Sequence, residues 1–263
     1  PMLGLLLIFM VVYGIINGAF KEALAFLFKP DFTKITSDTF LVAMGQAFFS
    51  LSLGMGSIMA YGAYMSKDQN IASTSVSVGA LDTLVAIMAG LAVFPIIFAI
   101  QDLEASGGPG LVFISLQTAF NTMDFGNIIG PIFFILLSVA ALSSSISILE
   151  PGVAYLAEED YLSRTKSAVI ISLTCWLIGI GTAFGFDQDG NNFFQANIEL
   201  ISVNIMQPLG GMLIAIFIGW YMKESIIKDE LGDINQVVYS TWRIFIRFVA
   251  PIGVGIVLLS QLF

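Results

Sequence analysis

Residues 40–66, FLVAMGQAFFSLSLGMGSIMAYGAYMS, decide the fold of this chain. The run is apolar and long enough to cross a bilayer, but its middle is unfavourable for a helix. Glycine has weak helix propensity, and serine hydroxyls compete for backbone hydrogen bonds. Residues of these two types crowd the middle of the run: Ser50, Ser52, Gly54, Gly56 and Ser57. The pattern therefore predicts two half-helices that meet at an unwound segment near 50–56.

Such a break has chemical consequences inside a membrane. In hydrocarbon, a broken helix survives only where it lines a polar cavity or is buried in protein. Unwinding frees carbonyl groups that can hold a cation, and it exposes a helix N-terminus that can hold an anion. The alternative is a continuous helix whose small residues let a neighbouring helix pack closely. Composition alone leaves both alternatives open.

The composition of the whole chain is that of an integral membrane protein. Its 263 residues are 57% hydrophobic and 11% charged, with a mean hydropathy of +0.91, whereas a soluble domain carries about 25% charged residues. A net charge of −9, without a basic run, argues against binding to nucleic acid. The chain has one cysteine and no histidine, so it lacks the commonest general base and metal ligand.

The apolar segments predict an all-α protein with seven transmembrane helices, one of them broken. Seven segments reach or approach the roughly 20 residues that cross a bilayer. They are 1–18, 40–64, 80–101, 126–157, 166–186, 197–222 and 239–262. The chain opens directly on an apolar run without the features of a signal peptide, so we expect it to begin inside a larger protein.

Lysine and arginine predict the orientation in the membrane. With residue 1 on the cytoplasmic side, the cytoplasmic connections hold more basic residues than the external ones. The cytoplasmic set is Lys67, Arg164, Lys166, Lys223, Lys228, Arg243 and Arg247, and the external set is Lys21, Lys29 and Lys34. We therefore expect a multi-pass protein of the cell inner (plasma) membrane with residue 1 in the cytoplasm.

Polar residues within apolar spans are costly, so each is a candidate for function. Asp82 and Glu199 lie near span ends, where an ordinary interfacial carboxylate is the alternative. Three serines at 143–145 present hydroxyl groups around much of one helix, and we expect at least one to face protein or an ion. A serine can also bond the carbonyl one turn back. The QPLGG sequence at 207–211 predicts a distortion in mid-span.

Two connections differ in character. The connection 102–125 is too apolar for a solvated loop, and LVFISLQTAF within it has a helical pattern. It is either a re-entrant segment that dips back toward the protein or a short interfacial helix. The connection 65–79 is polar and rich in serine, which is typical of a linker.

Four motifs together resemble the neurotransmitter:sodium symporter family, and most of all its bacterial eleven-helix members. In chain order they are GQAFFSLSLGMGSIMAYGAYM, LDTLVAIMAGLAVFP, GGPGLVFISLQTAF and ALSSSISILEP. The resemblance covers nearly the whole chain. It implies a fold of two inverted five-helix repeats, of which residues 1–263 form one partial transporter domain covering helices five to eleven. Residues 40–222 would be the second repeat, 239–262 an extra C-terminal helix, and the N-terminal helices would be missing.

The resemblance also implies a substrate pocket at the break. Phe49 is similar to the aromatic lid over the substrate, and Ser50 to a ligand of the first sodium that also borders the pocket. Ser52 and Met55 match positions that line the pocket. Family members often carry an aromatic residue at the Met55 position, so selectivity for the substrate side chain differs here. A flexible thioether could accept a large apolar group.

The resemblance also implies which residues of this chain belong to the two sodium sites of the family. Asp82 matches a first-sodium position that holds asparagine in many members. Ala140, Ser143 and Ser144 match the second sodium site, and Ser144 and Ile148 also border the substrate pocket. These oxygens suit sodium, because hard cations prefer oxygen ligands.

The external gate is the last set of positions implied by the resemblance. Gln46 and Glu199 match gate residues that pair in the family with an arginine on the missing first helix. Phe49 belongs to the same gate.

These observations predict a sodium-coupled symporter of amino acids or related small compounds that works by alternating access, with Na+ as the coupling ion. The carboxylate of Asp82 beside sodium would supply the negative charge that chloride supplies elsewhere, and Ala86, one turn on, has no group to hold chloride. We therefore expect chloride-independent transport. The alternative is a transport-dead relic or scaffold subunit in the membrane. An intramembrane enzyme is less favoured, because the sequence shows no nucleophile or acid–base constellation.

Overall fold

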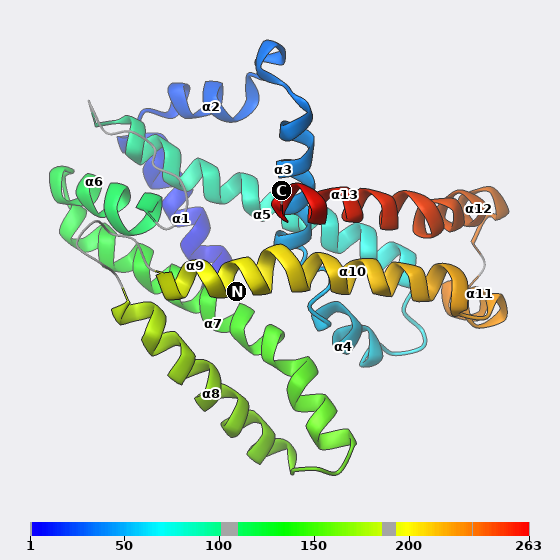
Figure 1. The fold of residues 1–263 in the computed structure, drawn as a ribbon. Helices are drawn as coiled ribbons and strands as arrows, with labels where there is room; N and C mark the ends of the chain where they lie inside the picture. Colours follow the sequence, from blue (N-terminus) through cyan, green and yellow to red (C-terminus); the bar gives the residue numbers. More distant parts are fainter. Residues whose placement is uncertain (1, 101–109, 186–192, 233, 263) are drawn as a thin grey trace. The chain divides into compact units, whose positions relative to one another are not determined.

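The computed structural model describes residues 2–100, 110–185, 193–232 and 234–262 (Figure 1). Nearly all of these residues are helical, and none of them lies in a strand. The chain forms two compact units, one from Pro1–Ile35 and Val78–Ser145, the other from Thr36–Ser77 and Ile146–Phe263. One boundary between the units lies between Ile35 and Thr36, and the other two fall within two long helices, α5 (Ile71–Phe98) and α7 (Gly126–Glu158).

The first unit packs four helical segments around one apolar core. They are α1 (Met2–Asn17), most of α5, the segment formed by η2 (Leu111–Ser115) and α6 (Leu116–Thr122), and the first part of α7. The core side chains are Leu7, Met10, Ala92, Ile96, Ile97, Leu116, Ala119, Phe120, Ile129, Phe133 and Leu136. The unit also contains α2 (Phe20–Phe28) and the short turn η1 (Phe32–Lys34).

The chain turns sharply between α1 and α2, whose axes differ by 115°. The turn lies against α5, where the N–H of Ala19 donates to the carbonyl of Pro95 at 2.8 Å. A side chain on Gly18 would collide with that same Pro95 carbonyl. Glycine at this position therefore permits the close approach.

The apolar connection is helical and packs into the core. Leu116 and Ala119 of α6 are fully buried, and the ring of Phe120 packs at a tilt against that of Phe133 of α7, with centroids 5.7 Å apart. This burial favours a segment that dips back into the protein over a helix lying on its surface. The residues 101–109 that precede it lie outside the described part of the chain.

The second unit contains the remaining helices. They are α3 (Ser37–Ser50), α4 (Ser57–Ala63), α8 (Arg164–Phe184), α9 (Phe193–Glu199), η3 (Leu200–Met206), α10 (Gln207–Ile216), η4 (Phe217–Tyr221), α11 (Glu224–Leu231), α12 (Gln236–Ile244), η5 (Phe245–Val249) and α13 (Ala250–Leu262). The segments η3, η4 and η5 are π-helical. Helix α10 runs beside α13, and α3 packs against α13 (Figure 1).

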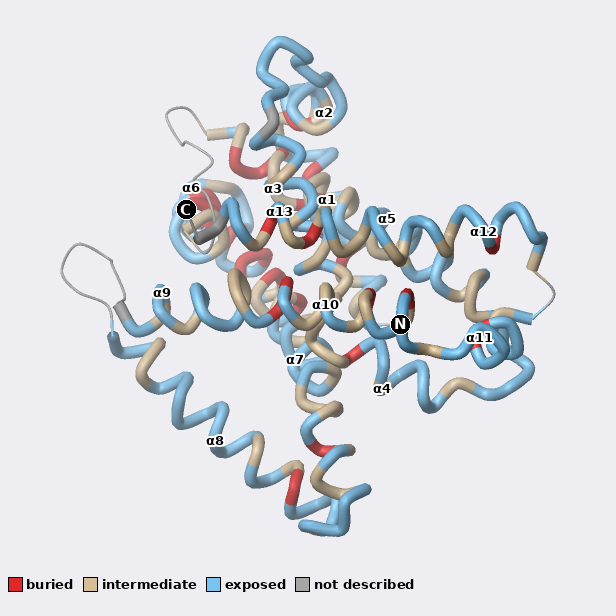
Figure 2. Tube along the Cα trace, turned by 45° about the vertical axis from the view of Figure 1, so that its right-hand side comes forward, coloured by how far each residue is buried: buried red, intermediate tan, exposed pale blue. Residues whose placement is uncertain are grey.

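Five described helices are long and apolar enough to cross a membrane: α5, α7, α8, Phe194–Tyr221 and Gln236–Ser260. The first predicted span corresponds to α1, which is shorter at 16 residues. The second is divided into α3 and α4. Most of α8 is exposed (Figure 2) although its sequence is apolar, as expected for a helix whose solvent is lipid.

The predicted start of the third span was wrong, because α5 begins at Ile71 rather than near residue 80. The side chain of Asn70 accepts the N–H of Ser73 at 2.9 Å, which caps the helix. The hydroxyls of Ser75 and Ser77 bond the carbonyls four residues back. Residues 71–79 are therefore the beginning of α5 and not a linker, whereas 65–70 lie outside a helix.

Candidate functional site

The predicted break is confirmed. Helix α3 ends at Ser50 and α4 begins at Ser57. The N–H of Leu53 donates to the carbonyl of Phe48, and the N–H of Ser52 to that of Phe49, each at 3.0 Å. This pair of bonds is a Schellman motif, the usual way in which a helix end satisfies its last carbonyls.

The backbone of the break alternates into the left-handed region. Ser52 has φ 52°, Gly54 φ 80° and Gly56 φ 84°. The two glycines adopt this conformation without steric cost. Ser52 occupies the position where a Schellman motif usually carries glycine, and a side chain at positive φ is uncommon.

Four of the predicted substrate residues lie together in this short stretch. Phe49 and Ser50 form the exposed end of α3, and 52% of the Phe49 surface is accessible. Ser52 and Met55 lie in the unwound segment and are half-buried. Their assembly with Ser144 and Ile148 of α7 into one pocket stays a prediction.

Helix α7 carries the oxygens predicted to hold the second sodium. The hydroxyl of Ser143 donates to the carbonyl of Ala140 at 2.8 Å, so these two oxygens share one face of the helix. The hydroxyl of Ser145 bonds the carbonyl of Ala141 at 2.9 Å. Both bonds match the alternative in which a serine bonds the preceding turn. The oxygen pair also suits a hard cation, which would take the same two atoms as ligands.

The remaining predicted residues lie on three helices. Asp82 is half-buried within α5 rather than at its end, and Ala86 follows one turn later. Gln46 is exposed one turn before the end of α3. Glu199 is the exposed last residue of α9, at the junction with the π-helix η3. The roles of Gln46 and Glu199 as a gate stay predictions.

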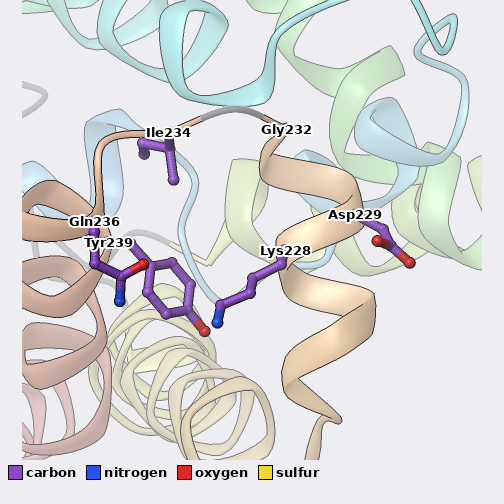
Figure 3. Close-up of a pocket in the computed structure, with 6 residues that line it drawn as sticks. All are labelled: Lys228, Asp229, Gly232, Ile234, Gln236 and Tyr239. Atoms are coloured by element: carbon purple, nitrogen blue, oxygen red, sulfur yellow. The ribbon is translucent and has the colours of Figure 1, made fainter.

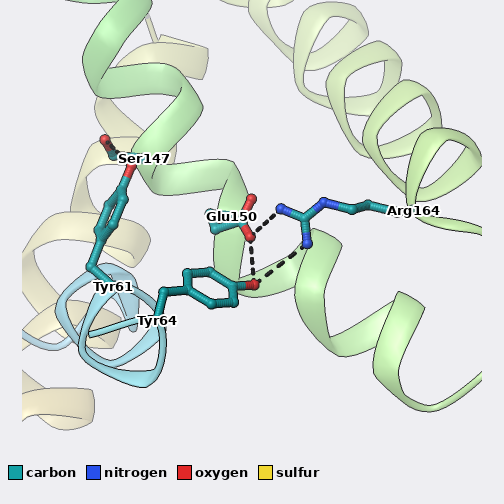
Figure 4. Close-up of polar contacts among 5 residues, drawn as sticks. All are labelled: Tyr61, Tyr64, Ser147, Glu150 and Arg164. Atoms are coloured by element: carbon teal, nitrogen blue, oxygen red, sulfur yellow. Dashed lines mark hydrogen bonds and ion pairs between the residues drawn. The ribbon is translucent and has the colours of Figure 1, made fainter. Parts of the chain in front are cut away.

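A polar cluster that the sequence analysis did not identify joins α4 to α7 and α8 (Figure 4). The carboxylate of Glu150 accepts the hydroxyl of Tyr64 at 2.9 Å and pairs with the guanidinium of Arg164 at 2.6 Å. One turn earlier on α4, the hydroxyl of Tyr61 lies 3.0 Å from that of Ser147. Glu150 is an acidic residue inside an apolar span, and that signal could have identified the cluster.

A cavity of about 420 Å³ lies between α11 and α12, lined by Lys228, Asp229, Gly232, Ile234, Gln236 and Tyr239 (Figure 3). The ammonium of Lys228 lies 5.2 Å from the centre of the Tyr239 ring and 2.8 Å from the carboxylate of Glu224. This hydrogen-bonded pair lowers the pKa of Glu224 and raises the pKa of Lys228. The cationic group of the cavity already has an acidic partner, so we assign this cavity no ligand.

Comparison with known proteins agrees with the motifs. The sequence model of the Sodium:neurotransmitter symporter family matches residues 2–263. An uncharacterized sodium-dependent transporter of Haemophilus influenzae is 34% identical over all of this chain and 59% of its own length. The uncharacterized sodium-dependent transporter YhdH of Bacillus subtilis is 32% identical over 99% of this chain and 59% of its own length.

A solved structure shares the fold. The crystal structure of MhsT in complex with L-phenylalanine superposes with a TM-score of 0.84 and 43% sequence identity, covering 99% of this chain and 60% of that one. The chain thus spans about three fifths of the length of these relatives. The family is one of membrane transporters and not of enzymes. The chain is a multi-pass membrane protein that belongs to the sodium:neurotransmitter symporter family.

Proposed function

We propose that this chain supplies helices five to eleven of a sodium-coupled symporter for amino acids. The observation that carries the proposal is the break between Ser50 and Ser57, where three residues of positive φ interrupt an apolar span. A break of this kind within an apolar span is tolerated where it lines a polar cavity or is buried in protein, and broken helices of transporters use it to bind substrate and ions. Helices supplied by an N-terminal part of the same protein complete the pocket, and residue 1 lies on the cytoplasmic side of the plasma membrane.

The substrate class is an amino acid with a large apolar side chain. The related protein MhsT binds L-phenylalanine, and it is 43% identical to this chain. Met55 lies in the unwound segment with Ser52, and its flexible thioether adapts to apolar groups of different shape. Phe49 covers the substrate from the end of α3.

Sodium provides the driving force. Ser50 and Asp82 contribute to one sodium site, and Ala140, Ser143 and Ser144 contribute to a second. A sodium ion beside the substrate carboxylate offsets the cost of burying either charge alone, so each favours binding of the other. Asp82 supplies negative charge near the first sodium, which makes transport independent of chloride.

The break also supports alternating access. Helix α3 contacts α10 and α13, whereas α4 makes its polar contacts with α7 and α8. The unwound segment between them has few helical hydrogen bonds to lose when one half moves relative to the other. The two halves can therefore open the pocket to opposite sides of the membrane in turn.

The test is uptake by the full-length parent protein in proteoliposomes, with labelled amino acids and an inward sodium gradient. We expect uptake of apolar amino acids with sodium and none with choline. Replacing chloride by gluconate leaves the wild-type rate unchanged, and Asp82→Asn makes it depend on chloride. A properly inserted protein that binds and transports no amino acid would instead be the relic or scaffold, and wild-type uptake that collapses without chloride would refute the role of Asp82.

A further inference from the structure

Gln207, the first residue of α10, reaches across to the end of α3. Its side-chain amide nitrogen donates to the carbonyl of Phe48 at 2.9 Å, between positions 159 residues apart in the chain. Only 3% of its surface is exposed. The bond is therefore buried and joins two elements of the same compact unit.

The backbones on either side of this bond approach as closely as glycine allows. A side chain on Gly54 would collide with the carbonyl of Gln207, and one on Gly210 would collide with the carbonyl of Gly54. A side chain on Gly211 would lie 2.5 Å from the ring of Phe48. The unwound segment therefore packs directly against the backbone of the first turn of α10.

The carbonyl of Phe48 is the acceptor that closes α3. One of its two lone pairs takes the N–H of Leu53 in the Schellman motif, and the other takes the amide of Gln207. The peptide group that carries this carbonyl leads directly into Phe49 and then Ser50. Fixing its plane therefore fixes how the last turn of α3 presents Phe49 and Ser50.

The nitrogen and the oxygen of the Gln207 amide differ in their contacts. The side-chain oxygen of Gln207 is buried and has no hydrogen-bond partner in the described part of the chain. An unpaired buried acceptor is costly, so packing alone would favour an apolar side chain of the same shape. The orientation of the amide is dictated by the Phe48 carbonyl, which can only accept. The N–H donor is thus the part of the Gln207 amide that bonds within the described part of the chain.

We propose that Gln207 is a positioning residue for the substrate and sodium site, because its amide holds the peptide that orients Phe49 and Ser50. The proposal rests on the proposed function of the break. It adds a contribution from α10, which carries none of the positions implied to bind substrate or sodium. Gln207 directly follows the π-helix η3, a seven-residue segment that separates it from Glu199. π-Helical segments within α-helices are frequent at functional sites.

The experiment compares two substitutions of Gln207 in the full-length parent protein. Gln207→Met keeps the shape and removes the donor. Gln207→Glu restores a donor only when the carboxyl group is protonated, a state that burial favours. Thr174→Val on α8 is the matched control, since it removes a hydroxyl whose bond stays within its own helix.

We expect Gln207→Met to raise the sodium concentration for half-maximal uptake and the KM for substrate about fivefold, the value of one net hydrogen bond. The maximal rate and the midpoint of thermal unfolding change little. Gln207→Glu approaches wild-type affinity at low pH and loses it as the pH rises, while Gln207→Met shows the same defect at every pH. Thr174→Val behaves as wild type.

Unchanged affinities in Gln207→Met, or Gln207→Glu matching Gln207→Met at every pH, would overturn the proposal. A second measurement does not depend on transport. In ligand-free protein, the amide of Leu53 should exchange with deuterium faster in Gln207→Met than in wild type, and equal rates would overturn the proposal. A wild type without sodium-driven uptake would instead refute the proposed function, and the exchange rates would still decide whether Gln207 holds the segment.

Discussion

The two halves of the broken helix are anchored by different chemistry. Helix α3 is held by buried contacts, in which Gln207 bonds the Phe48 carbonyl and glycine backbones touch. Helix α4 is held by a polar cluster at an accessible edge, where 59% of the Arg164 side chain and 15% of the Glu150 side chain are exposed. The hydroxyl of Tyr64, which joins the end of α4 to Glu150, belongs to an exposed residue and can exchange that bond for one to water. The amide of Gln207 is buried and cannot readily do so. Under the proposed alternating access, we therefore expect α4 to detach more readily than α3.

The largest effect is expected from adding a side chain where the unwound segment touches α10. Gly54→Ala places a side chain at φ 80° against the carbonyl of Gln207. The strain alone is about 1–2 kcal/mol, and the collision adds to it. We expect uptake to be lost and thermal unfolding of the full-length protein to shift to lower temperature.

Gly62→Ala is the matched control within α4, where an added methyl group meets nothing within 4 Å. It should leave uptake intact and raise helix stability by up to about 1 kcal/mol. Uptake and thermal stability in Gly54→Ala that match those of Gly62→Ala would show that the break does not require glycine at position 54.

The second effect tests the anchor of α4. Arg164→Gln leaves the carboxylate of Glu150 with Tyr64 as its one described partner and should lower the stability of the protein, by less than a buried pair would because the Arg164 side chain is mostly exposed. Adding Glu150→Gln should recover part of that loss, because the unpaired charge is removed. A double-mutant cycle of Arg164 and Glu150, followed by thermal unfolding, measures the coupling between α8 and α7. Strictly additive losses would mean that the ion pair does not support the polar cluster to which Tyr64 at the end of α4 is bonded.

The third effect separates ion binding from packing on α7, the helix to which α4 is anchored. Ser143→Ala removes a predicted sodium ligand and should raise the sodium concentration for half-maximal uptake about fivefold. Ser145→Ala removes a hydroxyl that bonds only the preceding turn among its described contacts, and sodium dependence should not change. Equal sodium dependence in both variants would favour packing for the whole serine cluster.

The smallest effect lies outside both anchors, in the ion pair of Glu224 and Lys228 on α11. The pKa of Glu224 is lowered, so its contribution to stability is present above the unfolded value of about 4.3 and is lost as the pH falls through the folded value. The raised pKa of Lys228 means that its contribution is lost only as the pH rises above about 10.4. Both partners are solvated, so wild type and Glu224→Gln should differ slightly at pH 7 and converge under acid or high salt. A large difference at pH 7 would assign α11 a larger structural role.

The break was predictable from sequence because its cause is local. Glycine and serine at 50–57 weaken a helix whatever surrounds it, and the helical pattern of 111–120 was likewise sufficient to predict α6. The start of α5 was not predictable in this way, because a serine-rich stretch is typical of a linker. In the structure Asn70 caps the helix, and the Ser75 hydroxyl bonds the carbonyl one turn back.

Long-range contacts explain the rest of what sequence missed. QPLGG at 207–211 suggested a distortion, but the distortion is the π-helix before it, and Gln207 begins a regular helix with Pro208 at its start. The role of Gln207 depends on Phe48, which is remote in sequence. The same is true of Tyr64 and Glu150, which lie 86 residues apart. Sequence indicated the chemistry of single residues but not which pairs the fold brings together.

Deuterium exchange across 51–56 tests the central claim most directly, that this segment is unwound and binds sodium and substrate. The measurement uses the wild-type full-length protein, with the peptide from α8 as the reference for a continuous helix. Without ligands, amides of 51–56 should exchange faster than those of α8, and sodium with L-phenylalanine together should slow them while α8 stays unchanged. Exchange as slow as that of α8 without ligands, or unaffected by sodium and L-phenylalanine, would contradict the account.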